Sequence, residues 1–258
     1  MSQLTIRPAQ KPMLGDIAVP ADKSITHRAL ILGALARGTT RVENALDCET
    51  TRATLNCLQA LGVDIEPVDA QTLKIYGRGL HSLQEPDSPL FCKGSGTTMR
   101  LLAGVCAGQE FFSLLDGTPA LRRRPMARVI EPLRQMGAQV LARGCGTLPP
   151  LAIRGGPLRG IDYNMPVASA QVKSALLFAG LAAGVPMTLR EPAPSRDHTE
   201  RMLGALGVNS INTPGSVLRF SPPSALHSPS CAIEIPNDFS SASFLIVAAL
   251  LIRDSEIR

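Results

Sequence analysis

Residues 94–108 read GSGTTMRLLAGVCAG, residues 23–38 read KSITHRALILGALARG, and residues 169–184 read SAQVKSALLFAGLAAG. All three stretches share one pattern. A serine stands beside small or basic residues, a helix-like apolar run follows, and Ala-Gly or Arg-Gly closes it. Such repetition along a chain is the mark of a repeat architecture, so this pattern determines the fold.

The residues that follow each stretch repeat as well. A short strand-like run comes first, then an amphipathic helix closing on a glycine, then a last short strand. In order, these runs are TTRVENAL, TRATLNCLQALGVDI and LKIYG; QEFFSLLDG, MARVIEPLRQMGAQV and LAIRG; and VPMTLREP, TERMLGALGVNSI and LRFS. The opening serines Ser24, Ser95, Ser169 and Ser240 lie 71, 74 and 71 residues apart, and the closing glycines Gly62, Gly137 and Gly207 lie 75 and 70 apart. Because the serines and the glycines recur with nearly the same spacing, we predict three βαβαββ-like units between about residues 20 and 230.

A fourth copy begins at IPNDFSSASFLIVAALLIRDSEIR, residues 235–258, and contains only its first helix. The apolar residues of that helix would have little to pack against; they include Leu245, Ile246, Val247, Leu250 and Leu251. We therefore expect this chain to be a fragment of a longer protein. An intact mass above 27.3 kDa for the protein from its source would support that expectation.

Composition limits the class of protein. The 258 residues are 45% hydrophobic and 18% charged, which favours a folded chain, and 3% aromatics predict an aliphatic core. A net charge of +5 suits a small anionic substrate as well as nucleic acid. The low content of aromatic residues argues against a surface on which the bases of single-stranded nucleic acid would stack. The six cysteines lack C-x-x-C spacing, which indicates free thiols in a reducing compartment rather than a metal site or disulfides. No signal peptide or membrane-spanning stretch is present, so we expect a soluble, cytoplasmic protein without a membrane partner.

The repeat also predicts an anion-binding face. A serine at a helix start is a good N-cap, and helix N-termini carry about half a positive charge. If the units surround a common axis, several helix starts converge on one spot. Basic residues stand at matching places in the units: Lys23, Arg28, Arg100, Arg122, Arg123, Arg124, Lys173, Arg196 and His198.

Taken singly, each of these features has a structural explanation. A serine is often only a cap, an arginine run is often a solvated surface, and GSGTT lacks the lysine of a Walker loop. Asp197 and Glu200 could act as general bases, yet carboxylates at helix starts are commonly caps. A functional site is favoured because a serine with a nearby basic residue recurs at the same position in each unit.

Six motifs resemble, in order and spacing, the signatures of the 5-enolpyruvylshikimate-3-phosphate synthase family. They are PADKSITHRALILGALARG, GSGTTMRLLAG, RRRPMARVIEPLRQMGA, SAQVKSALLFAGL, SRDHTERML and PNDFSSASF. Together they span essentially the whole chain and are specific, although GSGTT alone is not. SAQVKS and SRDHTE resemble the class II type of the family more than the enterobacterial type.

The resemblance implies an α/β fold, the enolpyruvyl transferase fold, in which repeated βαβαββ units form an inside-out α/β barrel with parallel central helices. Two similar domains hold three units each, and the active site is the cleft between them. Residues 19–232 would form one complete, substrate-binding domain. Residues 1–18 would be the N-terminal strand segment of a split second domain, and residues 233–258 its truncated beginning.

The family transfers the enolpyruvyl group of phosphoenolpyruvate to the 5-hydroxyl of shikimate 3-phosphate and releases phosphate, a step in chorismate and aromatic amino acid biosynthesis. The resemblance implies no metal or organic cofactor, and a monomer as full-length enzyme. Addition and elimination through a tetrahedral ketal phosphate need a proton donor, a base, and cations for the departing phosphate. The family's acid/base carboxylates would lie beyond Arg258, so we expect this chain to be inactive alone.

Carried over position by position, the family's motifs assign Lys23 to both substrates and make it the catalytic residue present here. The implied contacts to shikimate 3-phosphate are Lys23, Ser24, Arg28, Ser169, Ala170, Gln171 and Arg196. The implied contacts to phosphoenolpyruvate are Lys23, Gly96, Arg124 and Gln171.

The chain departs from the family beside the expected phosphoenolpyruvate pocket. The family usually has Gly-Asn before Ser-Gly-Thr-Thr, whereas this chain has Lys93-Gly94. Our hypothesis is that this change alters affinity for phosphoenolpyruvate or for analogues such as glyphosate. Gly94→Asn in an otherwise full-length enzyme tests it, and unchanged kinetics would refute it.

Three other functions stay open at this point. The sister family that acts on UDP-N-acetylglucosamine typically has Lys-Asn in the first helix and a reactive cysteine before its Arg-Pro; this chain has Lys23-Ser24 and no cysteine at residues 116–125. A non-catalytic anion-binding half-domain also fits the chain taken literally. Nucleic-acid binding lacks a basic stripe or a recognised motif.

Overall fold

The computed structural model describes residues 11–258 apart from 209, 214, 215 and 230. Residues 1–10 of the predicted N-terminal segment therefore lie outside the described part, as does Asn209 in the third predicted amphipathic helix.

Three consecutive units repeat one order of helices and strands. The first comprises α1 (Lys23–Leu35), β2 (Arg37–Glu43), α2 (Glu49–Ala60), β3 (Asp64–Pro67) and β4 (Leu73–Arg78). The second comprises β5 (Leu90–Phe91), α3 (Gly96–Ala107), β6 (Phe112–Asp116), a short 3-10 helix (Leu121–Arg123), α4 (Ala127–Gln135), β7 (Gln139–Ala142), α5 (Arg143–Gly146) and β8 (Leu148–Arg154). The third comprises β9 (Ile161–Asn164), α6 (Ala170–Ala183), β10 (Met187–Arg190), α7 (His198–Ala205), β11 (Ser210–Thr213) and β12 (Val217–Phe220). The prediction of three βαβαββ-like units is confirmed.

Each unit carries a four-stranded sheet with the same pairing. In the second and third units the opening strand lies parallel to the next strand, and the last two strands are antiparallel, giving the orders β5-β6-β8-β7 and β9-β10-β12-β11. The first unit takes its opening strand from much later in the chain, because β13 (Ile233–Glu234) lies parallel to β2. A strand just beyond the predicted boundary at residue 232 thus completes the first sheet.

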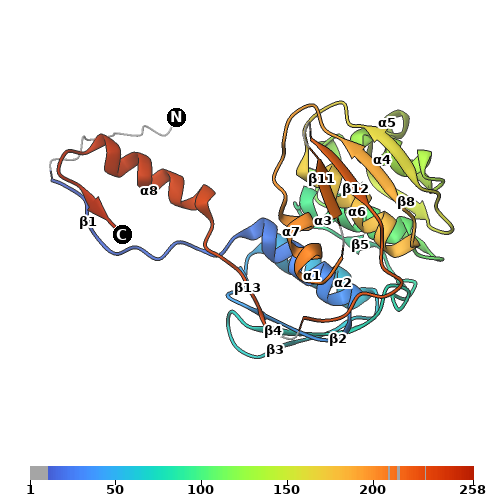
Figure 1. Cartoon of the computed structure of the whole chain (residues 1–258), viewed down its shortest axis with the longest axis horizontal. Helices are drawn as coiled ribbons and strands as arrows, with labels where there is room; N and C mark the ends of the chain where they lie inside the picture. The colour runs from blue at the N-terminus through green and yellow to red at the C-terminus, as the bar shows by residue number, and fades with distance from the viewer. Residues whose placement is uncertain (1–10, 209, 214–215, 230) are drawn as a thin grey trace.

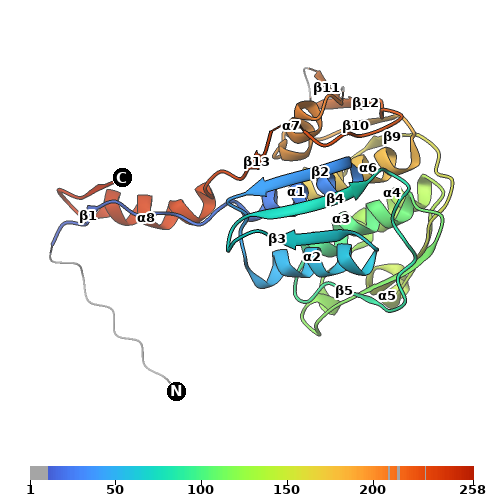
Figure 2. The same ribbon diagram turned by 90° about the horizontal axis from the view of Figure 1, so that it is seen from below.

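The first helices of the three units, α1, α3 and α6, form the centre of the body (Figure 1). They are buried on nearly all sides, as expected for helices that are apolar all round. Helices α3 and α6 pack especially closely at Gly104, where an added Cβ would lie only 2.0 Å from the carbonyl oxygen of Ala175. Figure 2 shows β2 and β4 lying across α1, so the sheets cover these helices from outside.

The helix caps correct one expectation from the repeat. Ser95 and Ser169 cap α3 and α6 as predicted, each side chain accepting the backbone N–H three residues later. Ser24 does not cap α1, since Asp22 does so by accepting the Ile25 N–H at 2.8 Å. Asp238 likewise precedes and caps the helix that contains Ser240. An aspartate two residues earlier competes successfully for the cap position in these two units.

The closing glycines have a common backbone conformation. Gly62, Gly137 and Gly207 have φ values of 84°, 108° and 78°. Each follows the second helix of its unit, in the left-handed region that residues with a side chain rarely adopt. Their regular spacing in the sequence therefore records a turn that each unit needs.

The remaining elements form an arm beside the body (Figure 1). Helix α8 (Phe239–Leu251) lies next to β1 (Leu14–Gly15), which pairs with β14 (Glu256–Ile257). Two extended segments join arm to body, because the Asp22 N–H donates to Pro236 O and the Asp238 N–H donates to Pro20 O, both at 2.8 Å. No residue of α8 is buried, and Phe244 and Leu250 are each 80% exposed, as the sequence predicted for the fourth helix. Within the part of the chain that the structure describes, no helix has both the length and the apolar character needed to cross a membrane.

Candidate anion-binding site

The predicted site residues lie mainly at the starts of the three central helices. Lys23 and Ser24 are in the first turn of α1, with Lys23 exposed. Gly96 is the first residue of α3. Ser169 caps α6, and Ala170 and Gln171 begin it. Since backbone N–H groups at helix starts are free of intrahelical partners, each start presents donors that suit an anion.

Hydrogen bonds join the starts of α3 and α6. The Gln171 amide donates to Thr97 Oγ1 at 2.8 Å, and its oxygen accepts from Arg100 Nη1 at 2.8 Å. Arg100 Nη2 also donates to Pro125 O at 3.2 Å, next to Arg124. Arg100 thus holds two predicted site segments together, a role that the family motifs did not assign to it. Its spacing of four residues from Gly96 on one helix face was the available signal.

Positive charge gathers at the start of α3. A Cβ added to Gly96 would lie 2.8 Å from Arg100 Nη1 and 3.3 Å from Arg124 Nη1, so a side chain there would displace the guanidinium groups. Burial, together with the charges of Arg128 and Arg124, lowers the pKa of Arg100. Buried Arg100 Nε has no hydrogen-bond partner among the described residues. Cations held together with spare donors are suited to an anionic ligand.

Arg28 lies deeper than a surface-binding residue would. It is 2% exposed, and burial lowers its pKa to about 10. Its guanidinium donates to Thr199 Oγ1, Ser174 Oγ and Ser24 O at 2.7–2.8 Å, and to Ala170 O at 3.5 Å. Four of the five guanidinium N–H groups are therefore used, which leaves one on Nη1. Arg28 ties the starts of α1 and α6 to α7 and keeps one donor for a ligand.

The expectation that Lys173 faces an anion is wrong. Lys173 is 3% exposed, and its Nζ lies 2.7 Å from Glu191 Oε2 and 2.7 Å from Glu200 Oε1. Ser195 donates to the other oxygen of Glu191. Despite burial, these carboxylates raise the pKa of Lys173, so it stays charged. Position 173 lies on a helix face packed inside the body, and Glu200 serves this buried ion pair rather than the open face.

Arg196 and Arg124 are exposed, as ligand-binding side chains at an open face would be. Arg196 Nη2 donates to Ser240 Oγ at 3.1 Å, which connects the start of α7 to the start of α8. Of the neighbouring arginines, Arg122 forms an ion pair with Asp116 and so belongs to the protein's own contacts. Burial, with a smaller contribution from the charge of Arg28, lowers the pKa of His198, and the charges of Asp22 and Asp197 oppose that shift.

The sequence departure beside Gly96 has a structural consequence. Lys93 has a φ of 51°, a left-handed conformation that glycine adopts without strain. Its ammonium lies 5.5 Å from the centre of the Phe91 ring. A Cβ at Gly94 would meet only Thr118 Oγ1, at 4.0 Å, so this position has room for a side chain.

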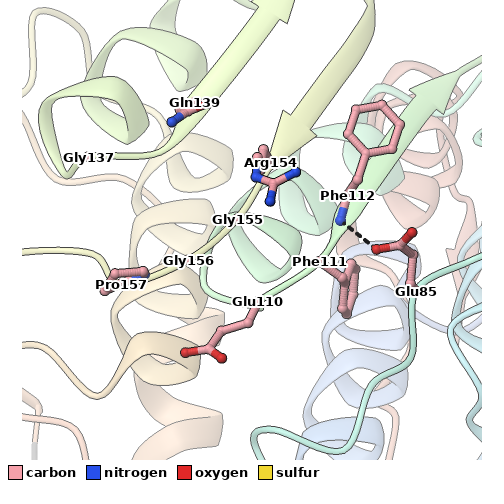
Figure 3. A pocket seen from close by; sticks show the side chains of 10 residues that line it. All are labelled: Glu85, Glu110, Phe111, Phe112, Gly137, Gln139, Arg154, Gly155, Gly156 and Pro157. Atoms are coloured by element: carbon pink, nitrogen blue, oxygen red, sulfur yellow. Dashed lines mark hydrogen bonds between the residues drawn. The ribbon is translucent and has the colours of Figure 1, made fainter.

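A cleft of about 570 Å³ lies elsewhere, between the ends of β6 and β8 and the loops beside them (Figure 3). Glu85 and Glu110 line it together with Arg154, and Glu85 Oε2 accepts the Phe112 N–H at 3.0 Å. None of the predicted site residues lines this cleft, and its two carboxylates make it a poor site for a phosphate. Over the described residues, no group of three or more His, Cys, Asp or Glu side chains is placed to hold a metal ion.

Comparisons with known proteins identify the family. The model of the family described as EPSP synthase (3-phosphoshikimate 1-carboxyvinyltransferase) matches residues 8–258. A protein named 3-phosphoshikimate 1-carboxyvinyltransferase from Thermodesulfovibrio yellowstonii is 49% identical over 248 residues, covering 96% of this chain and 57% of that protein. One of the same name from Desulforudis audaxviator is 50% identical over 256 residues, covering 98% and 58%.

A solved EPSP synthase structure from Acinetobacter baumannii matches with a TM-score of 0.88 and 42% identity, covering 97% of this chain and 56% of that chain. The expected fold is thereby confirmed. The chain spans less than three fifths of the length of these relatives. With the family model matching almost every residue, the chain belongs to the EPSP synthase family.

Proposed function

We propose that this chain supplies one face of the active site of a 3-phosphoshikimate 1-carboxyvinyltransferase. That enzyme would transfer the enolpyruvyl group of phosphoenolpyruvate to the 5-hydroxyl of shikimate 3-phosphate and release phosphate. The observation that carries the proposal is that hydrogen bonds of Arg28 and Gln171 link the starts of α1, α6 and α3. Arg100 and Arg124 gather at the start of α3 and Lys23 is exposed at the start of α1, which suits two anionic substrates. The names of the relatives support this substrate class over UDP-N-acetylglucosamine.

Shikimate 3-phosphate would bind at the starts of α1 and α6. Lys23 and Arg196 are exposed cations for its phosphate, and Ser24 and Ser169 offer hydroxyls. Arg28 would contribute its remaining N–H while it holds Ser24 O and Ala170 O in place. Ala170 would contribute its backbone.

Phosphoenolpyruvate would bind at the start of α3. Because Gly96 has no Cβ, the Arg100 and Arg124 guanidinium groups can approach this helix start, and Lys23 would reach the ligand from α1. Gln171 would lie between the two substrates, with its amide already fixed by Thr97 and Arg100. These cations would stabilise the phosphate as it leaves the tetrahedral intermediate. The proton donor and base would come from the part of the enzyme that corresponds to the remaining length of the relatives.

The division into domains at residues 18 and 232 belongs to the same proposal. The separation of the α8 arm from the body supports it (Figure 1), whereas β13, just beyond residue 232, pairs with the body's first sheet and so places the end of the body a few residues later. We also propose a cytoplasmic enzyme that is monomeric at full length. All six cysteines are free, including exposed Cys145 and Cys231, which supports a reducing compartment.

Calorimetric titration of this chain with shikimate 3-phosphate at low salt tests the proposal, with UDP-N-acetylglucosamine as control ligand. We expect heat with shikimate 3-phosphate only, and its loss in Lys23→Ala, because a cation at the start of α1 is removed. Lys11→Ala, at an exposed lysine that precedes β1, is the matched control and should bind normally. Equal heat with both ligands, or binding unaffected by Lys23→Ala, would contradict the proposed site.

A further inference from the structure

A buried hydrogen-bond chain runs from α1 through α2 to the start of α3. His27 Nδ1 lies 2.7 Å from Thr54 Oγ1, and Thr54 Oγ1 lies 2.7 Å from Thr98 Oγ1. Thr98 Oγ1 donates to Ser95 Oγ at 2.7 Å, and more weakly to Thr50 O at 3.3 Å. The four linked side chains are at most 3% exposed, and they belong to His27, Thr54, Thr98 and Ser95.

The hydrogen count along this chain allows one direction. Each hydroxyl has a single hydrogen. Thr98 gives its hydrogen to Ser95 and Thr50, so it has none left for Thr54. Thr54 must then donate to Thr98, and it has no hydrogen left for His27. The bond between His27 and Thr54 therefore needs a hydrogen on His27 Nδ1.

The other end of the imidazole agrees with this direction. His27 Nε2 is buried and has no partner among the described residues. In the Nδ1–H tautomer, Nε2 is a bare acceptor, whereas the other tautomer would bury an N–H without an acceptor. Orphaned buried N–H groups are the rarer and costlier of the two. Burial, with the charges of Arg28 and Lys23, lowers the pKa of His27 to about 3, so the ring stays neutral near pH 7.

At the far end, Ser95 is left with a hydrogen to donate. Its oxygen accepts from the Thr98 hydroxyl and from the Thr98 backbone N–H at 3.1 Å, and no described residue accepts its own hydroxyl hydrogen. Ser95 immediately precedes Gly96, where the arginines gather. A fixed donor at this point adds to the free N–H groups of the helix start.

We propose that His27, held as its Nδ1–H tautomer, is a positioning residue that orients the Ser95 hydroxyl through Thr54 and Thr98 as a donor to the anion bound at Gly96. The inference rests on the proposed function, because it takes that anion to be phosphoenolpyruvate. It adds Ser95 to the residues that contact the substrate. It also links the start of α1, which carries Lys23, to the start of α3.

The tautomer can be measured without any ligand. The chain has only four histidines, so nitrogen-15 NMR of histidine-labelled protein resolves His27. We expect a proton on Nδ1 and none on Nε2 at pH 7, with that state lost in Thr54→Val. A protonated Nε2 would overturn the proposal whatever the protein binds.

Ligand affinity tests the link to Ser95. In calorimetric titrations with phosphoenolpyruvate in the presence of shikimate 3-phosphate, we expect Thr54→Val and Ser95→Ala each to weaken binding about tenfold. The double variant should be no weaker than Ser95→Ala, because both changes remove the same donor. His27→Asn, whose amide can replace Nδ1–H, should bind like the parent, and His27→Leu should not. Thr40→Val, another buried threonine away from the site, is the matched control and should bind normally.

Additive losses in the double variant would overturn the proposal, because they would show two independent effects. Normal binding by Thr54→Val would overturn it as well. If the parent chain bound neither substrate while Nδ1 carried the proton, the proposed function would fail and the anion-donor role of Ser95 would fail with it. The tautomer measurement would still establish the direction of the hydrogen bonds from His27 to Ser95, independently of any ligand.

Discussion

Whether a buried cation in this protein can bind a ligand depends on the partners that neighbouring segments place around it. Arg28 and Lys173 both lie about one turn into apolar helices. Lys173 lies between the carboxylates of Glu191, just after β10, and of Glu200 in α7, whereas Arg28 donates to hydroxyl and carbonyl oxygens and retains one N–H. The first arrangement pairs the Lys173 ammonium with buried carboxylates and so keeps it from a ligand, whereas the second keeps one N–H of Arg28 available beside the proposed phosphate site.

His27 should make stability depend on pH. Its pKa is about 3 in the folded protein and near the ordinary 6.5 in the unfolded chain. Below pH 6.5 the unfolded state binds a proton that the folded state does not, so folding stability is lost as pH falls toward 3. We expect about 2 kcal/mol of this loss between pH 7 and pH 5. Urea unfolding at both pH values should show a larger drop for the parent than for His27→Asn. Equal drops would contradict the prediction.

At position 93, glycine should give a more stable protein than alanine, the reverse of the usual order. The φ of 51° at Lys93 costs any residue with a Cβ about 1 kcal/mol, and glycine avoids this cost. Both Lys93→Gly and Lys93→Ala remove the contact with the Phe91 ring, so their difference isolates the backbone term. We expect Lys93→Gly to be about 1 kcal/mol more stable than Lys93→Ala in urea unfolding. An alanine variant as stable as the glycine variant would show that this turn relaxes freely.

At the scale of elements, the close approach of α3 and α6 sets the geometry of the site. These helices carry Gly96, Arg100, Ser169 and Gln171 near their starts, so their spacing determines whether Gln171 reaches Thr97 and Arg100. Gly104 permits this spacing, because its backbone nearly touches Ala175. Packing in the middle of the helices therefore supports the contacts at their ends.

Two helical glycines test this dependence. Gly104→Ala places a methyl group against a backbone carbonyl, and we expect a loss of about 2 kcal/mol or more in unfolding free energy. Gly204→Ala, in α7, meets no atom within 4 Å and should stabilise the protein by up to about 1 kcal/mol through helix propensity. Guanidinium unfolding measures both. The same sign for the two variants would contradict the close packing of α3 on α6.

At the scale of the whole molecule, the arm and the body differ in what they bury. The body has an aliphatic core around α1, α3 and α6, whereas α8 presents Phe244, Leu250 and Leu251 at about 80% exposure. The three units of the body pack against one another. Helix α8 is attached mainly through the two extended segments that join arm to body and through the contact of Arg196 with Ser240. Exposed apolar helices of this kind promote association.

Substitutions on α8 should separate association from stability. We expect Phe244→Gln with Leu250→Gln to leave the unfolding free energy within about 0.5 kcal/mol of the parent, because neither side chain is buried. The same variant should self-associate less, as measured by analytical ultracentrifugation. Leu177→Ala, fully buried in α6, is the positive control and should cost about 2–5 kcal/mol. A comparable loss in the α8 variant would mean that α8 packs on the body.

The repeat, the sheet-and-helix order of each unit, the glycine turns and the family could all be predicted from the amino-acid sequence. These depend on local preference and period, which are written along the chain: apolar runs, Ser95 and Ser169 as caps, and Gly62 and its equivalents. The sequence also predicted that Lys23 and Gly96 lie at helix starts, and the roles of these residues remain predictions.

Which distant residues lie in contact became clear from the folded structure. It gave the first sheet its edge strand β13 from about 190 residues away, turned Lys173 inward onto two carboxylates, and joined Arg100 to Gln171. It also connected His27 to Ser95 through two threonines on other helices. Such contacts depend on how the units pack rather than on any local pattern, because burial and hydrogen-bond partners are properties of the assembled core.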